Sequence, residues 1–406
     1  MRCALPLLIV VLGAGCARPP AADAPLDVRP IAAPAGRGSE PQLSVSNRGV
    51  ILSWVERDGP VTMLKFAERT ASGWTAPVTA ASGTGWFVSY ADPPSVMRLS
   101  NGTLVAQYQQ RTHRFTESMN LQLSYSTDNG SRWSPPFMPH HDGTISQHAF
   151  AAPFELPGNG LGLVWLDGRA TMIETEDPAG GAMGLRYAAF DANWRQVADQ
   201  PVDGRVCECC SMAAAATADG MLLAFRDRAA DEARDISVSR LENGAWSAVT
   251  PVHADGWITY ACPVNGPALS ARGRSAVVSW FTVKNDQGQA YAAFSADSGG
   301  SWGAPIRVDD GGSLGRVDVE LLDDGSAIAI WIEFASGRAQ LRARQIDASG
   351  MRSAPITLAG LGDARATGMP RLARHGGELV FAWTESEAGA DASEPVMRLR
   401  TAIAVP

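Results

Sequence analysis

Lysine is nearly absent from this chain of 406 residues, and long apolar stretches are few. Lys65 and Lys284 are the only lysines, so arginine supplies nearly all of the positive charge. Lysine and arginine together number 34 against 42 acidic residues, which gives a formal net charge of −8. This charge argues against nucleic acid and against an anionic membrane surface as partners. Beyond the N-terminus, no uncharged apolar run is long enough for a membrane-spanning helix.

The N-terminus reads MRCALPLLIVVLGAGCARPP, with a cation at Arg2 and a short apolar core before small residues. This order predicts a secretory signal. The ending Gly-Ala-Gly-Cys resembles the lipobox of bacterial lipoproteins, which implies that Cys16 is lipidated. Residues 1–16 are then the signal peptide, 17–25 a tether and 26–406 the folded part; an ordinary cleaved signal is the alternative. The resemblance implies a lipoprotein of the cell envelope, on the outer membrane facing the periplasm or the cell surface, which contacts the membrane only through its anchor.

One unit recurs along the chain at spacings of roughly fifty to sixty residues and predicts the blades of an all-β propeller. Its second strand is the clearest part, because it is a short apolar run bounded by Gly and polar residues. The seven copies cover residues 49–57, 102–111, 160–169, 220–228, 274–283, 325–333 and 377–385. We therefore expect seven blades, with six as the alternative. The seventh unit lacks a fourth strand, and residues 26–34 resemble an orphan one, so an N-terminal strand is expected to close the ring.

Two turns between third and fourth strands share the pattern Ser-x-Asp-x-Gly-x-x-Trp. The matching residues are Ser126, Asp128, Gly130 and Trp133 in the first turn, and Ser295, Asp297, Gly299 and Trp302 in the second. The pattern resembles the Asp box, or BNR repeat, of sialidase-like propellers. We expect a structural role, in which Asp accepts turn amides, Gly is left-handed and Trp packs between blades. In that family these turns lie on the face opposite the active site.

Polar residues gather in the loops that are expected on the other face, around the axial mouth where propellers usually bind ligands. Arg169, Arg226, Arg228 and Arg316 are the candidate ligand-binding cations. Resemblance to sialidases implies an acid and a Tyr nucleophile, for which Asp92 and Tyr260 are the candidates. The Arg-Ile-Pro motif of true sialidases is absent, so no catalytic residue is carried over by motif. The alternative is a solvated rim whose arginines pair with neighbouring acids.

Four cysteines remain in the mature chain, in a compartment where disulfides persist. Cys207, Cys209 and Cys210 are expected to open the inner strand of the fourth blade, and Cys262 that of the fifth. Adjacent blades place the two segments side by side, with His148 as the nearest imidazole. Of three disulfide connectivities, Cys209–Cys262 with Cys207–Cys210 has the most comfortable spacing.

A metal site is the second interpretation of these residues. Thiolates with one imidazole suit copper or zinc, and the Cys-x-x-Cys spacing also permits a redox role. The leading functional hypothesis is an envelope-anchored, sialidase-like propeller that binds an acidic glycan or a protein partner at its mouth. Whether the protein also hydrolyses the glycan is left open by this hypothesis. The alternative is a metal-binding or redox protein that uses the cysteine cluster.

Overall fold

The computed structural model describes residues 26–113, 118–172, 181–361, 367–387 and 396–406. Cys16, the expected signal peptide (1–16) and the expected tether (17–25) lie outside the described residues. Within them the protein is almost entirely β-structure, with one short 3₁₀ helix at Arg169–Met172. None of the described helical residues forms a helix long and apolar enough to cross a membrane.

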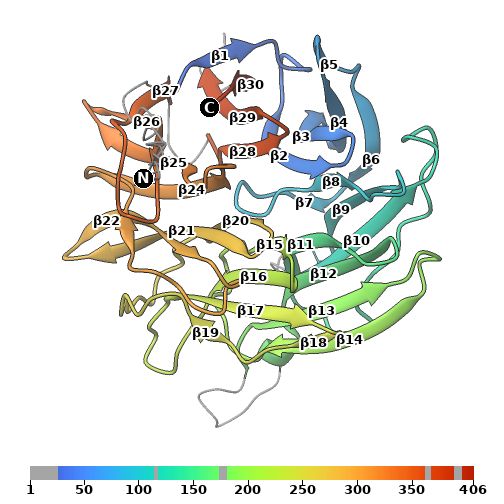
Figure 1. The fold of residues 1–406 in the computed structure, drawn as a ribbon. Helices are drawn as coiled ribbons and strands as arrows, with labels where there is room; N and C mark the ends of the chain where they lie inside the picture. Colours follow the sequence, from blue (N-terminus) through green and yellow to red (C-terminus); the bar gives the residue numbers. More distant parts are fainter. Residues whose placement is uncertain (1–25, 114–117, 173–180, 362–366, 388–395) are drawn as a thin grey trace, which may run out of the picture.

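The strands of the described residues form seven antiparallel sheets arranged in a ring (Figure 1), which we number as blades in chain order. Blade 1 contains β2 (Ser39–Ser46), β3 (Gly49–Asp58), β4 (Val61–Thr70), β5 (Gly73–Trp74) and β6 (Val78–Thr84). Blade 2 contains β7 (Trp86–Phe87), β8 (Ser95–Arg98), β9 (Leu104–Arg111) and β10 (Met119–Ser126). Blade 3 contains β11 (His148–Leu156), β12 (Gly160–Asp167), β13 (Gly184–Phe190) and β14 (Gln196–Asp203).

The second half of the ring follows the same plan. Blade 4 contains β15 (Ala213–Thr217), β16 (Gly220–Arg226), β17 (Ile236–Glu242), β18 (Ala245–Trp246) and β19 (Thr250–Pro251). Blade 5 contains β20 (Ala268–Arg272), β21 (Ser275–Lys284), β22 (Gln287–Ser295) and β23 (Ile306–Arg307). Blade 6 contains β24 (Ser313–Leu321), β25 (Ala327–Ala335), β26 (Arg338–Ile346) and β27 (Ile356–Gly360). Blade 7 contains β28 (Arg371–His375), β29 (Glu378–Glu387), β30 (Val396–Ala404) and the N-terminal β1 (Val28–Ile31).

The ring closes through the first and last strands of the chain. β1 pairs antiparallel with β30, with Val28 opposite Ala404 and Ile31 opposite Thr401. This pairing covers an edge of β30 that would otherwise present free backbone groups to other chains. The prediction of a seven-bladed propeller closed by an N-terminal strand is thereby confirmed, and the six-bladed alternative is excluded.

Each of the seven predicted second strands coincides with a strand that pairs on both sides within its sheet, and most of its side chains are buried. Four of these strands carry a Trp whose indole N–H donates to a carboxylate two residues later, on the same face of the strand. The pairs are Trp54–Glu56, Trp165–Asp167, Trp331–Glu333 and Trp383–Glu385, with N–O distances of 2.8, 2.9, 2.9 and 3.1 Å. The pairing satisfies the polar edge of a ring that is otherwise enclosed by apolar side chains.

The two Ser-x-Asp-x-Gly-x-x-Trp turns have closely similar geometry. Asp128 Oδ1 accepts the backbone N–H of Arg132 at 2.8 Å, and Asp297 Oδ1 accepts that of Ser301 at 2.8 Å. The Ser hydroxyl of each turn accepts the Gly N–H at 2.9 Å. Trp133 packs edge-on against Phe66 of the preceding blade, at 6.3 Å between ring centroids. In this geometry the Asp carboxylates organise the turns.

The inner strands of the blades surround an axial cavity of about 510 Å³. Its wall includes the carboxyl groups of Asp92, Asp318 and Glu320 and the guanidinium of Arg371. Burial raises the pKa of Asp92 to about 7 and that of Glu320 to about 8. The cavity wall therefore carries less negative charge near neutral pH than its composition indicates.

Candidate functional site

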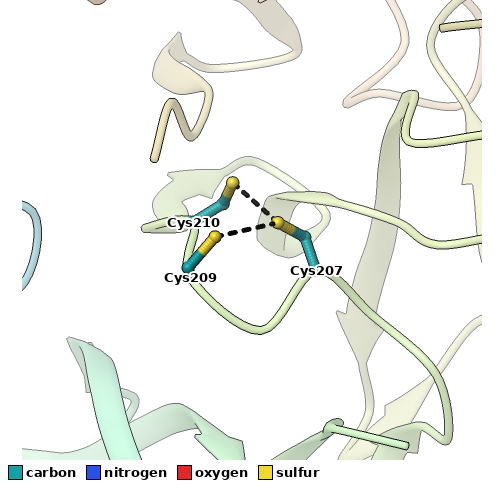
Figure 2. Close-up of side chains that lie close together, drawn as sticks. All are labelled: Cys207, Cys209 and Cys210. Atoms are coloured by element: carbon teal, nitrogen blue, oxygen red, sulfur yellow. Dashed lines mark hydrogen bonds between the residues drawn. The ribbon is translucent and has the colours of Figure 1, made fainter. Parts of the chain in front are cut away.

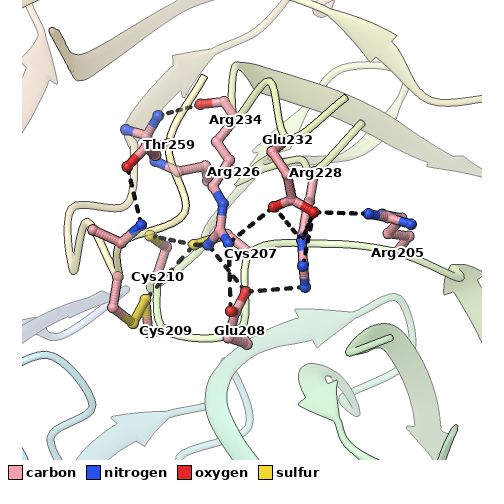
Figure 3. Close-up of polar contacts among 12 residues, drawn as sticks. Arg205, Cys207, Glu208, Cys209, Cys210, Arg226, Arg228, Glu232, Arg234 and Thr259 are labelled. Atoms are coloured by element: carbon pink, nitrogen blue, oxygen red, sulfur yellow. Dashed lines mark hydrogen bonds and ion pairs between the residues drawn. A yellow bond between two sulfur atoms is a disulfide. The ribbon is translucent and has the colours of Figure 1, made fainter. Parts of the chain in front are cut away.

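The four cysteines of the folded part come together at the junction of blades 4 and 5. Cys207, Cys209 and Cys210 lie in the segment between β14 and β15, and Cys262 lies between β19 and β20. Cys209 and Cys262 form a disulfide with a Cα–Cα distance of 6.1 Å, which links segments 53 residues apart (Figure 3). Cys262 is exposed and Cys209 is half-buried, so one end of this disulfide faces solvent.

Cys207 and Cys210 are free thiols beneath the disulfide. Their side chains are almost fully enclosed, with exposed fractions of 1% and 3%. The Sγ of Cys207 lies 2.8 Å from the Sγ of Cys210 and 3.8 Å from the Sγ of Cys209 (Figure 2). A dithiol with Cys-x-x-Cys spacing is thus in contact with a disulfide of the same chain.

The two buried thiols have different electrostatic surroundings. The hydrogen bond with Cys210 is the main cause that lowers the pKa of Cys207 to about 7, and the Cys209 amide and two guanidinium groups, Arg226 and Arg234, add to it. Burial raises the pKa of Cys210, and the neighbouring Cys207 raises it further. Of the two thiols, Cys207 is therefore the one that ionises more readily, and a lowered pKa is typical of reactive cysteines in Cys-x-x-Cys motifs.

Arg234 connects Cys207 to a group of surface charges. Its Nη1 donates to Cys207 Sγ at 3.6 Å and to Glu208 Oε2 at 3.0 Å, and its Nη2 lies 3.3 Å from Glu232. Glu232 in turn accepts from Arg228 and Arg205 at 2.9 Å each (Figure 3). The charges around the thiolate are thereby held in fixed positions, although Glu208 and Arg228 are partly open to solvent.

The predicted metal set of Cys207, Cys209, Cys210, Cys262 and His148 is not assembled as expected. Cys209 and Cys262 are bonded to each other, so neither offers a thiolate in this state. The Nε2 of His148 lies 3.0 Å from Asp142, and its ring stacks on His140, in a separate cluster of blade 3. His148 therefore contacts residues of the connection that precedes β11, and it is not a neighbour of the cysteines in the way that was predicted.

Arg226, a predicted ligand-binding residue, is directed into the protein. Only 2% of it is exposed, and its guanidinium donates to the backbone carbonyls of Asn265, Arg234 and Phe281 at 2.6–3.0 Å. Arg228 is engaged with Glu232 and Glu208. These two cations hold the loops around the cysteines, and the geometry gives no support to their predicted contact with a ligand carboxylate.

The other two predicted cations are engaged as well. Arg169 forms two hydrogen bonds with Asp167, at 2.7 and 2.8 Å, and lies 3.2 Å from Asp142. Arg316 is 8% exposed; it donates to the carbonyl of Gly368 and lies over the ring of Tyr90. All four predicted cations are therefore engaged within the protein. Arg169 and Arg228 pair with acids, as the alternative of a solvated rim describes, whereas Arg226 and Arg316 are buried and donate to backbone carbonyls.

The predicted catalytic pair, Asp92 and Tyr260, does not form a joint site. Asp92 is 3% exposed and accepts hydrogen bonds from the Phe150 amide at 2.8 Å and from Gln109 at 3.1 Å, on the wall of the axial cavity. Tyr260 is 84% exposed, two residues from Cys262 on the rim. The raised pKa of Asp92 is compatible with an acid, but Tyr260 does not line the cavity.

Sequence reasoning missed Arg234, Glu208, His140 and Asp142. Arg234 lies on the β16–β17 loop, 27 residues from the thiol that it contacts, and no spacing rule connects the two. The pattern His140-x-Asp142 with His148 six residues further is a signal in the chain. The spacing becomes informative only together with the burial of His140, which is 3% exposed and which the sequence alone does not reveal.

No known protein family matches the chain, and no curated protein matches its sequence. Solved structures do resemble it. A protein of unknown function from Dyadobacter fermentans has a TM-score of 0.51 and 14% identity, over 94% of this chain and 98% of that one. The polysaccharide lyase Uly1 has a TM-score of 0.52 and 11% identity, over 92% and 90%. A variant of the sialidase NanB from Streptococcus pneumoniae has a TM-score of 0.47 and 10% identity, over 93% of this chain and 94% of that one. At these identities, the first two likenesses show that this chain shares their overall fold.

Proposed function

We propose that the protein is a thiol–disulfide exchange protein whose centre is Cys207, Cys209, Cys210 and Cys262. One observation carries the proposal: the Sγ of Cys207 lies 3.8 Å from a sulfur of the Cys209–Cys262 disulfide and 2.8 Å from a second thiol. Exchange proceeds by attack of a thiolate on a disulfide sulfur, and it is fastest when the attacking thiol has a pKa near the ambient pH. Cys207, with a pKa of about 7, meets this condition.

The internal reaction balances without an added oxidant. The Cys207 thiolate attacks Cys209 Sγ, a Cys207–Cys209 bond forms, and the electron pair of the broken bond leaves on Cys262. Cys262 takes up a proton, and Cys210, once deprotonated, attacks Cys207 and releases Cys209. The buried pair has then become a disulfide and the outer pair a dithiol, so two electrons have moved from the interior to the surface.

The outer pair is the point of contact with a substrate. Cys262 is exposed whereas Cys207 and Cys210 are enclosed, so an external sulfur reaches the buried dithiol only through the Cys209–Cys262 pair. The reduced outer pair passes its two electrons to a protein disulfide, which becomes a dithiol as Cys209–Cys262 re-forms. The co-reactant is therefore a protein disulfide, and an external dithiol reverses the sequence.

A Cys210→Ser variant tests this sequence of steps because it removes the resolving thiol. We expect the exchange to stop after the first attack, so that mass mapping of alkylated peptides finds a Cys207–Cys209 bond and a free Cys262. The matched control is Cys207→Ser, which should retain Cys209–Cys262 and alkylate only Cys210. The proposal would be contradicted if Cys209–Cys262 were the sole disulfide found in Cys210→Ser between pH 6 and 9. The disulfide would then have a structural role only.

Metal content is measured on the same samples. The Sγ atoms of Cys207, Cys209 and Cys210 lie within 4.8 Å of one another, a set that suits copper(I) or zinc once the disulfide is opened. Stoichiometric metal that blocks alkylation of all four thiols in the reduced chain would favour the metal-binding alternative over exchange.

Carbohydrate binding at the axial mouth is the second candidate function. The observation that favours it is the cavity of about 510 Å³, with carboxyl groups of several blades on its wall. The likeness in fold to the polysaccharide lyase Uly1 is consistent with it. Because the four predicted arginines are paired internally, a neutral glycan fits this wall better than an acidic one. Screening neutral and acidic oligosaccharides against the wild type and Asp92→Asn separates the two, and hydrolysis of a sialylated fluorogenic substrate would restore the sialidase hypothesis.

The location in the cell envelope is part of the same proposal. Its support is the lipobox-like ending at Cys16 and the oxidising compartment that the disulfide requires. Labelling with radioactive palmitate should mark the wild type and not Cys16→Ser, and membrane fractionation identifies the outer membrane. Label that persists in Cys16→Ser would exclude a lipid anchor at this residue.

A further inference from the structure

A second cluster of metal-binding side chains lies in blade 3, apart from the cysteines. His140 and Asp142 lie in the connection between β10 and β11, and His148 is the first residue of β11. Asp142 Oδ2 is 3.0 Å from His148 Nε2 and 3.5 Å from His140 Nδ1, and one ligand atom from each of the three residues falls within 4.8 Å of the others. The two imidazoles are 3% and 0% exposed.

The surroundings of His148 call for a cation. Its Nδ1 lies 3.3 Å from the carbonyl oxygen of Met119, and its Nε2 faces Asp142 Oδ2. A neutral imidazole has one N–H, so when Nδ1 donates to the carbonyl, the Nε2 lone pair meets a carboxylate oxygen. A metal ion held by Nε2 and the carboxylate removes that repulsion. Metal-bound histidines commonly donate their other N–H to a backbone carbonyl, as Nδ1 does here.

His140 brings a second imidazole to the same carboxylate. Its ring lies parallel to that of His148, with 3.7 Å between centroids and 1° between planes, so the two rings present their edges to Asp142 together. Its Nε2 is buried and has no hydrogen-bond partner among the described residues. The Nδ1 of His140 and the Nε2 of His148 thus face one carboxylate oxygen at a position from which solvent is almost excluded.

Arg169 and Asp167 complete the surroundings. Asp167 Oδ2 lies 3.9 Å from His148 Nε2, and Arg169 pairs with Asp167 while reaching Asp142 at 3.2 Å. Two carboxylates against one guanidinium leave one negative charge beside the imidazoles. A divalent cation is therefore attracted to this position, with Arg169 limiting the net charge of the loaded site.

We propose that His140, Asp142 and His148 bind a divalent transition-metal ion of the zinc class. Two imidazoles and one carboxylate are the N/O donor set that zinc and its borderline neighbours prefer, and the absence of sulfur from the three residues disfavours copper(I). The site is independent of the proposed thiol exchange, because it shares no residue with the cysteine centre. Its burial suits an ion that fixes the β10–β11 connection to the start of blade 3.

The test measures zinc on the mature chain carrying Cys207→Ser and Cys210→Ser, so that free thiols bind none. After chelation and reloading with zinc, we expect about one ion per chain by mass spectrometry, and His148→Gln or His140→Gln should weaken binding at least tenfold. The matched control is His253→Gln, which removes a His that also faces a carboxylate, Asp255 at 3.0 Å, and should leave zinc unchanged. Far-ultraviolet circular dichroism establishes that each variant is folded.

Cobalt(II) provides a readout on the wild type that does not depend on a substitution. Binding at this site should give visible d–d bands without the intense ultraviolet charge-transfer band of a thiolate ligand. Failure of zinc and cobalt to bind the wild type, or zinc binding that persists in the His140→Gln/His148→Gln double variant, would overturn the proposal. A charge-transfer band on the wild type would assign the metal to the cysteines instead.

Discussion

Arg234 donates a hydrogen bond to the sulfur of Cys207 across 3.6 Å, in an environment where 1% of each side chain is exposed. A guanidinium stays protonated at any physiological pH, so this contact is a fixed positive charge beside the thiol. It favours the thiolate over the thiol and, through Glu208 and Glu232, is itself held in place. The hydrogen bond with Cys210 is the main cause of the lowered pKa of Cys207, and a loop of the same blade adds to it through Arg234.

Replacing Arg234 by Met should raise the pKa of Cys207. The thiolate loses a charged hydrogen-bond donor, and the carboxylates of Glu208 and Glu232 lose a counter-charge, so less thiolate is present at pH 7. We expect the formation of the Cys207–Cys209 bond in a Cys210→Ser background to slow several-fold at pH 7 and to recover at pH 9. The pKa is measured by the ultraviolet absorbance of the thiolate in a pH titration of Arg234→Met that retains Cys210, and bond formation in the Cys210→Ser background by mass mapping of alkylated peptides.

Arg228→Met is the matched control for this prediction. Arg228 belongs to the same group of charges and pairs with Glu232 and Glu208, but no hydrogen bond joins it to Cys207. An equal shift of the thiolate titration in both variants would mean that the general charge of the loop sets the pKa, and the specific Arg234 contact does not.

The fold could be predicted from the sequence because the information for it is local and repeated. Each second strand is an apolar run bounded by Gly or polar residues, and seven runs with one missing fourth strand leave a single way to close the ring. The role of the Asp128 and Asp297 turns was equally predictable, since each turn makes its own hydrogen bonds.

The candidate site could be predicted only in part. The segments carrying the cysteines meet because adjacent blades meet, which the repeat implies. Which arginine faces inward depends on tertiary contacts: Arg226 reaches carbonyls of Asn265 and Phe281, 39 and 55 residues away. The adjacent Asp227 does not neutralise Arg226 but accepts from Ser237, so sequence neighbours misled here. His148 was predicted beside the cysteines from its position in the neighbouring blade, but its Nε2 faces Asp142 and its ring stacks on His140.

The carboxyl groups of the axial cavity should make stability fall as the pH rises. Asp92 has a pKa of about 7 in the folded protein, above its ordinary 3.8, because burial disfavours the charge. The folded chain therefore binds more protons than the unfolded chain between these values, and the stabilisation present below pH 4 is lost as the pH rises through 7. From pH 5 to pH 8 this single group lowers the free energy of unfolding by about 2 to 3 kcal/mol.

Asp92→Asn should remove that part of the pH dependence. The amide cannot ionise, and Gln109 can turn its own amide toward it, because the Gln109 oxygen is buried without a partner among the described residues. Urea unfolding at pH 5 and pH 8 is the measurement, with exposed Asp323→Asn as the control. An equal change in the free energy of unfolding between pH 5 and pH 8 for Asp92→Asn and the wild type would show that Asp92 is already ionised in the folded state at pH 5.

Two turn glycines should differ in their tolerance of alanine: Gly299 of the second Ser-x-Asp-x-Gly-x-x-Trp turn, and Gly350 of the turn between β26 and β27. Gly299 has φ +79°, and a Cβ there would lie 2.6 Å from Leu222 Cδ1 of the preceding blade. Gly350 has φ +90°, but a Cβ there meets no atom within 4 Å. Gly350→Ala therefore carries only the backbone cost of about 1 kcal/mol, whereas Gly299→Ala adds overpacking of about 1 to 3 kcal/mol. Equal urea midpoints for the two variants would show that the contact between Gly299 and Leu222 adjusts to the extra methyl group at no cost in stability.

Arg226→Met separates the two interpretations of the arginines at the mouth. If Arg226 bound a ligand, its loss would weaken binding and leave the fold intact. The structure gives it four hydrogen bonds to three buried carbonyls, which methionine leaves unpaired, so we expect a loss of about 3 to 5 kcal/mol in the free energy of unfolding. Arg132→Met, at a side chain that is 90% exposed, is the control and should change stability by less than about 0.5 kcal/mol.

Because Arg226 also holds the segment around Asn265 against the cysteine loop, Arg226→Met should expose Cys210 to alkylation before global unfolding. A variant as stable as the wild type, with its thiols still protected, would return Arg226 to the list of ligand-binding candidates.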